Sequence, residues 1–196
     1  MSIMPLPNIS AAPGADVSLV GSVVAVAARL DHGFSKLTQG SILMVERHGV
    51  EGDAHAGPHV RHRHLAKSQP RLPNLRQVHL LPCGLFEEVR RAGFDIGPGS
   101  LGENVTTAGL DLTRLPLGTQ LHLGETAVIE LTGLRTPCRL IDRFQQGLKR
   151  QMIETTRPPR FKCGVLGIVT ANGEVKAGAT IRAVLPSNPW RILPAL

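Results

Sequence analysis

Short apolar segments separated by turn residues dominate the chain and predict a structure built mainly from strands. Two of them alternate apolar and polar positions around a turn, Gly124-Glu125 in one and Asn172-Gly173 in the other, which is typical of a hairpin. The predicted strands and hairpins are 17–30, 42–53, 76–82, 119–134 and 163–185. A small barrel is the natural closure of so many short strands, because a closed sheet leaves no edge exposed.

Two further segments, 84–94 and 139–153, place their apolar residues at helical spacing, and Gly93 is a stop signal for the first. The predicted apolar faces consist of Leu85, Phe86 and Val89 in the first helix and of Leu140, Ile141, Phe144 and Leu148 in the second. The pattern as a whole predicts a mainly β fold, a small β-barrel with peripheral α-helices.

A length of 196 residues favours one domain. We expect a flexible N-terminal arm at 1–16, the domain at 17–185 and a C-terminal tail at 186–196. Hydrophobic residues make up 42% of the chain but aromatic residues only 3%, so the predicted core is mostly aliphatic.

The sequence carries neither a charged apolar leader nor an apolar run long enough to cross a bilayer, which predicts a cytoplasmic protein without a membrane partner. Its three cysteines are widely spaced, and free thiols fit a reducing compartment. The net charge of +7 is compatible with nucleic-acid binding. However, five Phe, one Trp and no Tyr provide few stacking platforms, so we expect no nucleic-acid partner.

The segment Arg135-Thr136-Pro137-Cys138 joins a predicted strand to a predicted helix. Thr136 suits the N-cap and Pro137 the first helical position, which places Cys138 in the first turn. Unpaired backbone N–H groups, the helix dipole and the charge of Arg135 all favour a thiolate there. A thiolate is both a nucleophile and a soft metal ligand. Cys138 is therefore the candidate catalytic residue and metal ligand, with a small packed hydrophobe as the alternative.

The other two cysteines are predicted to serve packing. Cys83 also follows a proline at a helix start, but its nearest charged neighbours are Glu87 and Glu88, which do not favour a thiolate. Cys163 stands at the entry to an apolar strand.

Four histidines, His55, His59, His62 and His64, fall within ten residues. A zinc site would need four ligands held in a tetrahedral array, usually by rigid elements. Here arginines intervene between the histidines, and cations disfavour the binding of another cation. We therefore expect a basic loop that contacts an anion such as a phosphate or an oxo group, with a solvated loop as the alternative.

The glycine-rich loop 98–107 can bring backbone N–H groups close to a ligand. Its Gly102 permits close approach, Glu103 and Asn104 can hydrogen-bond a heterocycle, and Thr106 adds a hydroxyl. The alternative is a tight turn that Asn104 caps.

In their order along the chain these segments resemble the MOSC family, named for the C-terminal domain of molybdenum cofactor sulfurases. The matching segments are 52–57 (Gly-Asp-Ala-His-Ala-Gly), 76–78 (Arg-Gln-Val), 99–107 (Gly-Ser-Leu-Gly-Glu-Asn-Val-Thr-Thr), 135–138 (Arg-Thr-Pro-Cys) and 173–178 (Gly-Glu-Val-Lys-Ala-Gly). The resemblance covers about 45–185. Residue 179 is Ala where the family often has Asp, a departure that concerns the last turn only.

The resemblance implies a β-barrel-like fold and a cysteine that binds the molybdenum of a pterin cofactor or carries sulfur as a persulfide. On this basis Cys138 would be the metal ligand. The implied contacts to the cofactor's phosphate or oxo groups are Arg135, Arg76 and His55, and the implied pterin contacts come from Gly102, Glu103, Asn104 and Thr106.

Relatives with this domain include reductases of N-hydroxylated compounds, so the resemblance implies a molybdoenzyme subunit that acts on a small molecule and takes electrons from a separate redox protein. The alternative is a sulfur carrier that receives sulfur on Cys138 from a cysteine desulfurase. A cofactor-binding module without turnover is a third reading.

Overall fold

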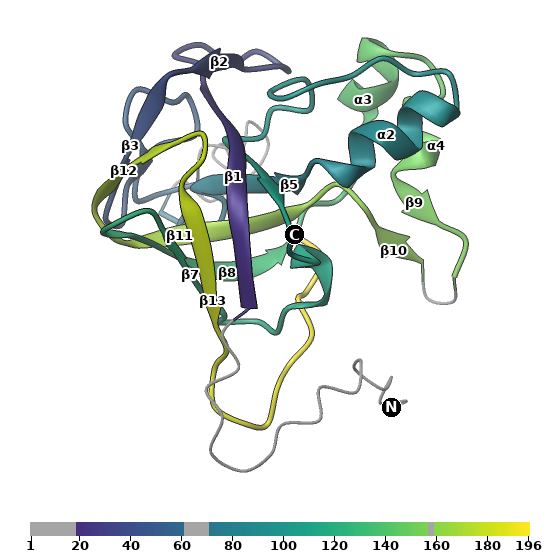
Figure 1. Cartoon of the computed structure of the whole chain (residues 1–196). Coiled ribbons are helices and arrows are strands. Elements are labelled where there is room, and N and C mark those ends of the chain that lie inside the picture. The colour runs from purple at the N-terminus through teal and green to yellow at the C-terminus, as the bar shows by residue number, and fades with distance from the viewer. Residues whose placement is uncertain (1–18, 61–70, 157–158) are drawn as a thin grey trace.

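The structure is a computed structural model that describes residues 19–60, 71–156 and 159–196. Within them seven strands form a closed barrel, because β13 pairs with both β7 and β1 (Figure 1). In order around the barrel they are β13 (Thr180–Val184), β7 (Gln120–Leu123), β8 (Ala127–Leu134), β11 (Val165–Ala171), β5 (Val78–Pro82), β6 (Val105–Ala108) and β1 (Leu19–Ala28). The predicted mainly β fold with a barrel and peripheral helices is confirmed.

Aliphatic side chains fill the barrel. Alternate residues of β8 turn inward, and Ile129 and Leu131 are fully buried beside Leu80, Leu121 and Val165 from neighbouring strands. This period of two is what a sheet with one packed face requires. The predicted hairpin at 119–134 is confirmed, because β7 and β8 pair in antiparallel register.

The predicted hairpin at 163–185 is wrong. After β11 the chain leaves the barrel for a second sheet, and it returns only at β13. The second sheet consists of β12 (Gly173–Lys176), β3 (Ser41–Val45) and β4 (Gly49–Val50). The turn at Asn172-Gly173 therefore passes the chain from one sheet to another, and local turn chemistry alone cannot distinguish the two outcomes.

The remaining elements are short and lie outside the barrel. They are β2 (Leu37–Gln39), which pairs with β1, the 3-10 helix η1 (Leu112–Arg114), and the pair β9 (Ile153–Glu154) and β10 (Arg160–Phe161). No helix among the described residues is long and apolar enough to cross a membrane. The predicted arm 1–16 lies outside the described residues.

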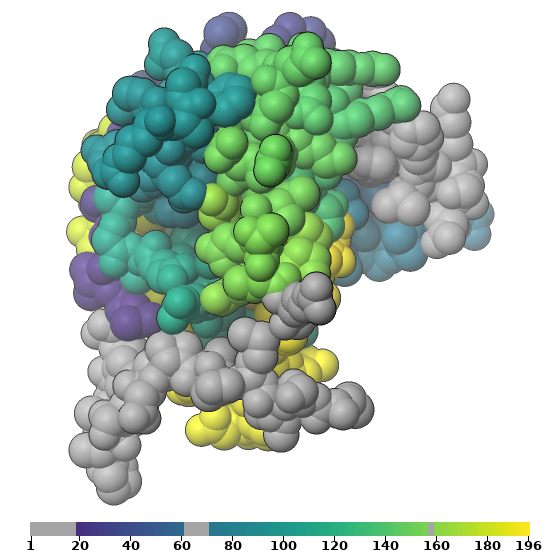
Figure 2. Space-filling view, turned by 90° about the vertical axis from the view of Figure 1, so that its right-hand side faces the viewer, coloured from purple at the N-terminus to yellow at the C-terminus, as the bar shows by residue number. Residues whose placement is uncertain are grey.

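Helices gather on one side of the barrel (Figure 1), the side that faces the viewer in Figure 2. The first predicted helix is confirmed as α2 (Gly84–Arg91), with its three predicted apolar residues buried. The second is divided into α3 (Arg139–Phe144) and α4 (Leu148–Gln151), because Gln145 is extended and Gly147 has a φ of 87°. Under these helices lies a second apolar cluster, composed of Leu81, Leu85, Phe86, Val89, Ile96, Leu101, Ile141, Leu148, Met152 and Cys163.

Candidate functional site

A cavity of about 210 Å³ opens beside the start of α3 and brings together residues from six separate segments of the chain. Most of the residues predicted from the sequence line it, namely Cys138, Arg135, His55, Arg76, Gly102 and Asn104. Among the lining residues that the sequence analysis missed are the polar side chains of Lys36, Asn74 and His79. We call this space the Cys138 cavity.

Cys138 lines this cavity from the N-cap position of α3, with extended backbone angles and a half-buried side chain. The helix thus begins two positions later than predicted from the sequence, and Cys138 precedes its first turn. Thr136 does not cap it, because the Thr136 hydroxyl donates instead to the carbonyl of Leu196 at 2.7 Å. With only six residues, α3 contributes a shorter row of aligned peptide dipoles than the predicted helix would have.

Arg135 lines the Cys138 cavity and also influences Cys163 electrostatically. The side chain of Cys163 is fully buried. Burial raises the pKa of that thiol to about 11, although the charge of Arg135 acts in the opposite direction. The Nη1 atom of Arg135 is itself buried and finds no hydrogen-bond partner in the described part of the chain. Cys163 therefore stays a packed thiol, as predicted, and Arg135 keeps one donor unused.

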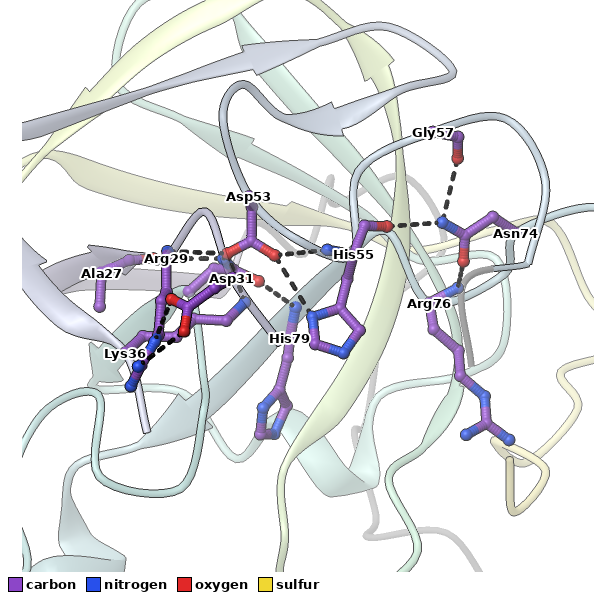
Figure 3. A network of polar contacts seen from close by, with 11 residues as sticks. Ala27, Arg29, Asp31, Lys36, Asp53, His55, Gly57, Asn74, Arg76 and His79 are labelled. Carbon is purple, nitrogen blue, oxygen red and sulfur yellow. Dashed lines mark hydrogen bonds and ion pairs between the residues drawn. The ribbon is translucent and has the colours of Figure 1, made fainter. Parts of the chain in front are cut away.

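Lys36 and Asp53 form a buried ion pair at the wall of the cavity (Figure 3). Their Nζ and Oδ2 atoms are 2.7 Å apart, and the side chains are 5% and 0% exposed. Burial lowers the pKa of Lys36 despite the neighbouring carboxylate. Burial alone would raise the pKa of Asp53, but the hydrogen bond from His55 and the charge of Lys36 outweigh it and hold that pKa well below the usual range. The carboxylate of Asp53 is therefore ionised at neutral pH.

The carboxylate of Asp53 also fixes His55 in the cavity wall. Its Oδ1 accepts the backbone N–H of His55 at 2.9 Å and lies 3.4 Å from the ring Nδ1. The ring remains 44% exposed on the cavity side. The other carboxylate oxygen accepts a hydrogen bond from Asn104 at 3.1 Å. Asp53 thus orients a histidine, an amide and an ammonium group at once.

Asn74 connects the His55 segment to Arg76. Its amide nitrogen donates to the carbonyls of His55 and Gly57 at 2.9 and 3.0 Å, and its oxygen accepts the N–H of Arg76 at 3.1 Å. Burial, and secondarily the charge of Arg135, lower the pKa of the Arg76 guanidinium. Arg76 thus meets another cation in the Cys138 cavity.

His79 is buried in β5 and presents a neutral ring to the cavity. Its Nε2 lies 2.6 Å from the carbonyl of Cys163, and burial lowers its pKa well below the usual value. Figure 3 shows the side chains of His55, Arg76 and His79 directed to the same side of the network.

The glycine-rich loop 98–107 contributes to the cavity wall through Gly102 and Asn104. Glu103 is fully buried, and its carboxylate accepts the N–H groups of Gly99 and Leu101 at 2.6 and 3.2 Å and the hydroxyl of Thr106 at 3.3 Å. Burial raises the pKa of this carboxyl. Glu103 and Thr106 are thus engaged within the loop and are not among the residues that line the cavity.

Gly102 is the loop residue that reaches the cavity itself. Its φ is 79°, and a Cβ atom there would lie 2.5 Å from the carbonyl oxygen of Phe34. A side chain at this position would therefore meet both backbone strain and a clash. Asn104 also lines the cavity, but its amide is held by the carbonyl of Ala27, the N–H of His79 and the carboxylate of Asp53.

Of the four clustered histidines, His55 belongs to this network. His62 and His64 lie outside the described residues, and His59 makes an isolated bridge with Pro73. Among residues 19–60, 71–156 and 159–196 no group of three or more His, Cys, Asp or Glu side chains is arranged to hold a metal ion. Cys83 is half-buried and lines a different cavity, of about 570 Å³, near η1 and β10.

Residues 51–182 match the family model described as "MOSC domain". The crystal structure of the YuaD protein from Bacillus subtilis superposes with a TM-score of 0.72 at 20% identity, covering 87% of this chain and 98% of that one.

YiiM from Escherichia coli gives a TM-score of 0.57 at 21% identity, over 87% of this chain and 73% of that one. YiiM from Geobacillus stearothermophilus gives 0.59 at 19% identity, over 89% and 78%. No curated protein sequence matches the chain. At these identities the likeness to the solved structures concerns the fold.

Proposed function

The chain belongs to the MOSC domain family, and we propose that it binds a molybdenum–pterin cofactor with Cys138 as metal ligand and reduces N-hydroxylated small molecules. The observation that carries the proposal is the composition of the Cys138 cavity. One half-buried thiol and three cationic side chains, Lys36, Arg76 and Arg135, face the same space. A ligand that combines a soft metal with an anionic group matches this set.

The unused donor of Arg135 supports the anionic half of this ligand. A buried guanidinium N–H without an acceptor costs roughly 1–3 kcal/mol, and more where the group is charged. A phosphate or oxo group in the cavity would accept that hydrogen bond. Arg76 would add a second guanidinium, and Lys36 would add an ammonium that Asp53 only partly neutralises.

The thiol of Cys138 supports the metal half. Cysteine sulfur is a soft ligand, and this cysteine borders a cavity whereas Cys163 is sealed in apolar packing. When bound, the cofactor would supply the two-electron chemistry. The protein would then ligate the metal, hold the anion and exclude water from the reacting groups.

Reduction of an N–OH group to N–H consumes two electrons and two protons and releases water. The His55 ring is held at Nδ1 by Asp53, and its second nitrogen, which has no hydrogen-bond partner among the described residues, would hold and donate a proton in the cavity wall. Asp53 would keep the ring in one orientation, as a buried carboxylate does in a catalytic dyad.

A metal and pterin analysis tests the proposal. The protein is purified from cells replete with molybdenum, beside Cys138→Ser and the matched control Cys83→Ser, which alters a half-buried cysteine outside the cavity. We expect near-stoichiometric molybdenum and pterin in the wild type and the control, and strong loss of molybdenum from Cys138→Ser. Equal molybdenum in all three proteins would remove the ligand role.

The accessibility of Cys138 also favours a second candidate function, that of a sulfur carrier. The Cys138 thiolate would attack the outer sulfur of a desulfurase persulfide, form a new S–S bond and release the donor as a thiolate. Arg135 would stabilise the resulting persulfide anion. Mass spectrometry after incubation with a desulfurase and cysteine tests this function: an adduct of one sulfur on Cys138, absent from Cys138→Ser, is expected of a carrier.

A further inference from the structure

Helix α3 places an exposed apolar patch at the mouth of the Cys138 cavity. Leu140 lines the cavity and is still 41% exposed. Phe144, which is 40% exposed, packs its ring against Phe34 with the ring centroids 5.3 Å apart, and Phe34 lines the cavity too. The patch is therefore continuous with the opening through which a small molecule would enter.

Helix α3, which carries this patch, and the following helix α4 together carry four cations. Arg139, Arg143 and Arg150 are exposed, and Lys149 is half-buried beside them. None of the four forms an ion pair with any described carboxylate. The one acidic residue of this stretch, Asp142, accepts the backbone N–H of Lys149 at 3.0 Å. We call the patch and its cations together the α3 surface; in Figure 2 it belongs to the green region on the helical side.

Several cations elsewhere in the described part of the molecule form ion pairs, unlike those of the α3 surface. Arg29 bonds Asp31, Arg114 bonds Asp111, and Lys162 contacts Glu88. An exposed cationic field without partners attracts an oppositely charged surface over about one Debye length, roughly 8–10 Å at physiological salt. Its unbalanced charge therefore suits an acidic partner.

We propose that the α3 surface docks an acidic electron-carrier protein, which delivers electrons to the cavity it borders. This inference rests on the proposed reductase function, because two electrons per N–OH group must come from a donor. The cations would steer the encounter, and Leu140 and Phe144 would provide the apolar contact at its centre. A protein partner fits better than a nucleic acid, since the one exposed aromatic ring of the patch, Phe144, already packs against Phe34 and leaves a base only part of its surface.

Binding of a purified acidic flavodoxin, a one-electron carrier, tests the surface. Its affinity is measured by calorimetry for the wild type, for Arg143→Glu/Arg150→Glu and for the charge-matched control Lys176→Glu/Arg182→Glu. The control changes two exposed cations on β12 and β13, on the opposite side of the molecule from α3 (Figure 1).

We expect the α3 variant to bind at least about tenfold more weakly and the control to bind within about twofold of the wild type. Raising the salt from about 0.05 M to about 0.5 M should remove most of the difference. Both variants should melt within about 2 °C of the wild type, since surface substitutions have small effects on stability.

Three results would overturn the inference: no flavodoxin binding at low salt, equal effects of the two charge reversals, or tighter binding of a short single-stranded oligonucleotide with the same dependence on Arg143 and Arg150. The proposed function is tested separately by the metal content and by turnover with a small chemical reductant, which needs no docking surface. If the protein lacks molybdenum but still binds flavodoxin through the α3 surface, the docking proposal stands and the reductase proposal is refuted. If the protein is active with the small reductant but gives any of these three results, the reductase proposal stands and the docking proposal is refuted.

Discussion

Cys138 and Cys163 both lie in the neighbourhood of Arg135, but their surroundings differ. Cys138 borders a cavity with cationic walls, whereas Cys163 belongs to the apolar cluster beneath α3 and α4 and is fully buried. Both are near the same guanidinium, yet burial raises the pKa of Cys163 to about 11. A neighbouring arginine therefore does not make a cysteine reactive unless solvent or a ligand can also reach the sulfur.

The largest expected effect is on alkylation of the native protein. Iodoacetamide should modify Cys138 at least about 1000-fold faster than Cys163, because the sealed thiol is rarely ionised near neutral pH and reaches solvent only when the structure opens. In denaturant the two rates should converge to within a few-fold. Peptide mass spectrometry over a time course measures both rates. Comparable rates in the native state would contradict the difference in accessibility between Cys138 and Cys163.

A second prediction concerns the apolar cover of Cys163. Ile141 is fully buried in the same cluster, and Ile141→Ala should cost about 3 kcal/mol in the free energy of unfolding and should speed the labelling of Cys163. Its neighbour Leu140 is 41% exposed, so Leu140→Ala should change stability by no more than about 0.5 kcal/mol. Urea denaturation separates the two, and equal losses would contradict the packing described for α3.

A third prediction concerns the charged wall of the cavity. Asp53 has a lowered native pKa, so its ionised form adds stability above the unfolded pKa of about 3.9, and that stability is lost as the pH falls through the native value. Asp53→Asn should destabilise the protein by about 2 kcal/mol at pH 7 and should flatten its stability profile below about pH 4. Urea denaturation across this pH range, with the exposed Asp31→Asn as control, checks it. A parallel acid profile in wild type and Asp53→Asn would show that the carboxylate is not selectively ionised in the native state.

The parts of the fold that were predicted correctly are those in which local pattern and tertiary structure agree. Alternation around Gly124 sufficed for the β7–β8 hairpin, and helical spacing sufficed for α2. The division at Gly147 was missed because the apolar period continues across it. The departure of β12 from the barrel was missed because strand partners are decided by contacts far away in sequence.

The candidate site shows the same limit. The resemblance indicated the cysteine, arginine and histidine that line the cavity, since their motifs are local. Lys36 and His79 gave no such signal: one is a single lysine before a short strand, and the other is a single histidine within an apolar strand. Their importance follows from burial, and the sequence did not reveal which polar groups would be buried. For the same reason Glu103 was expected to face a ligand, whereas its carboxylate is enclosed by its own loop.

The central claim is that the Cys138 cavity, and not the Cys163 cluster or the Cys83 cavity, holds the cofactor. Alkylation of the freshly isolated protein, compared before and after removal of its molybdenum, tests it most directly. We expect Cys138 to be protected at least about tenfold while molybdenum is bound and to become reactive on its removal, with Cys83 unchanged. Full reactivity of Cys138 in protein that carries stoichiometric molybdenum would contradict it.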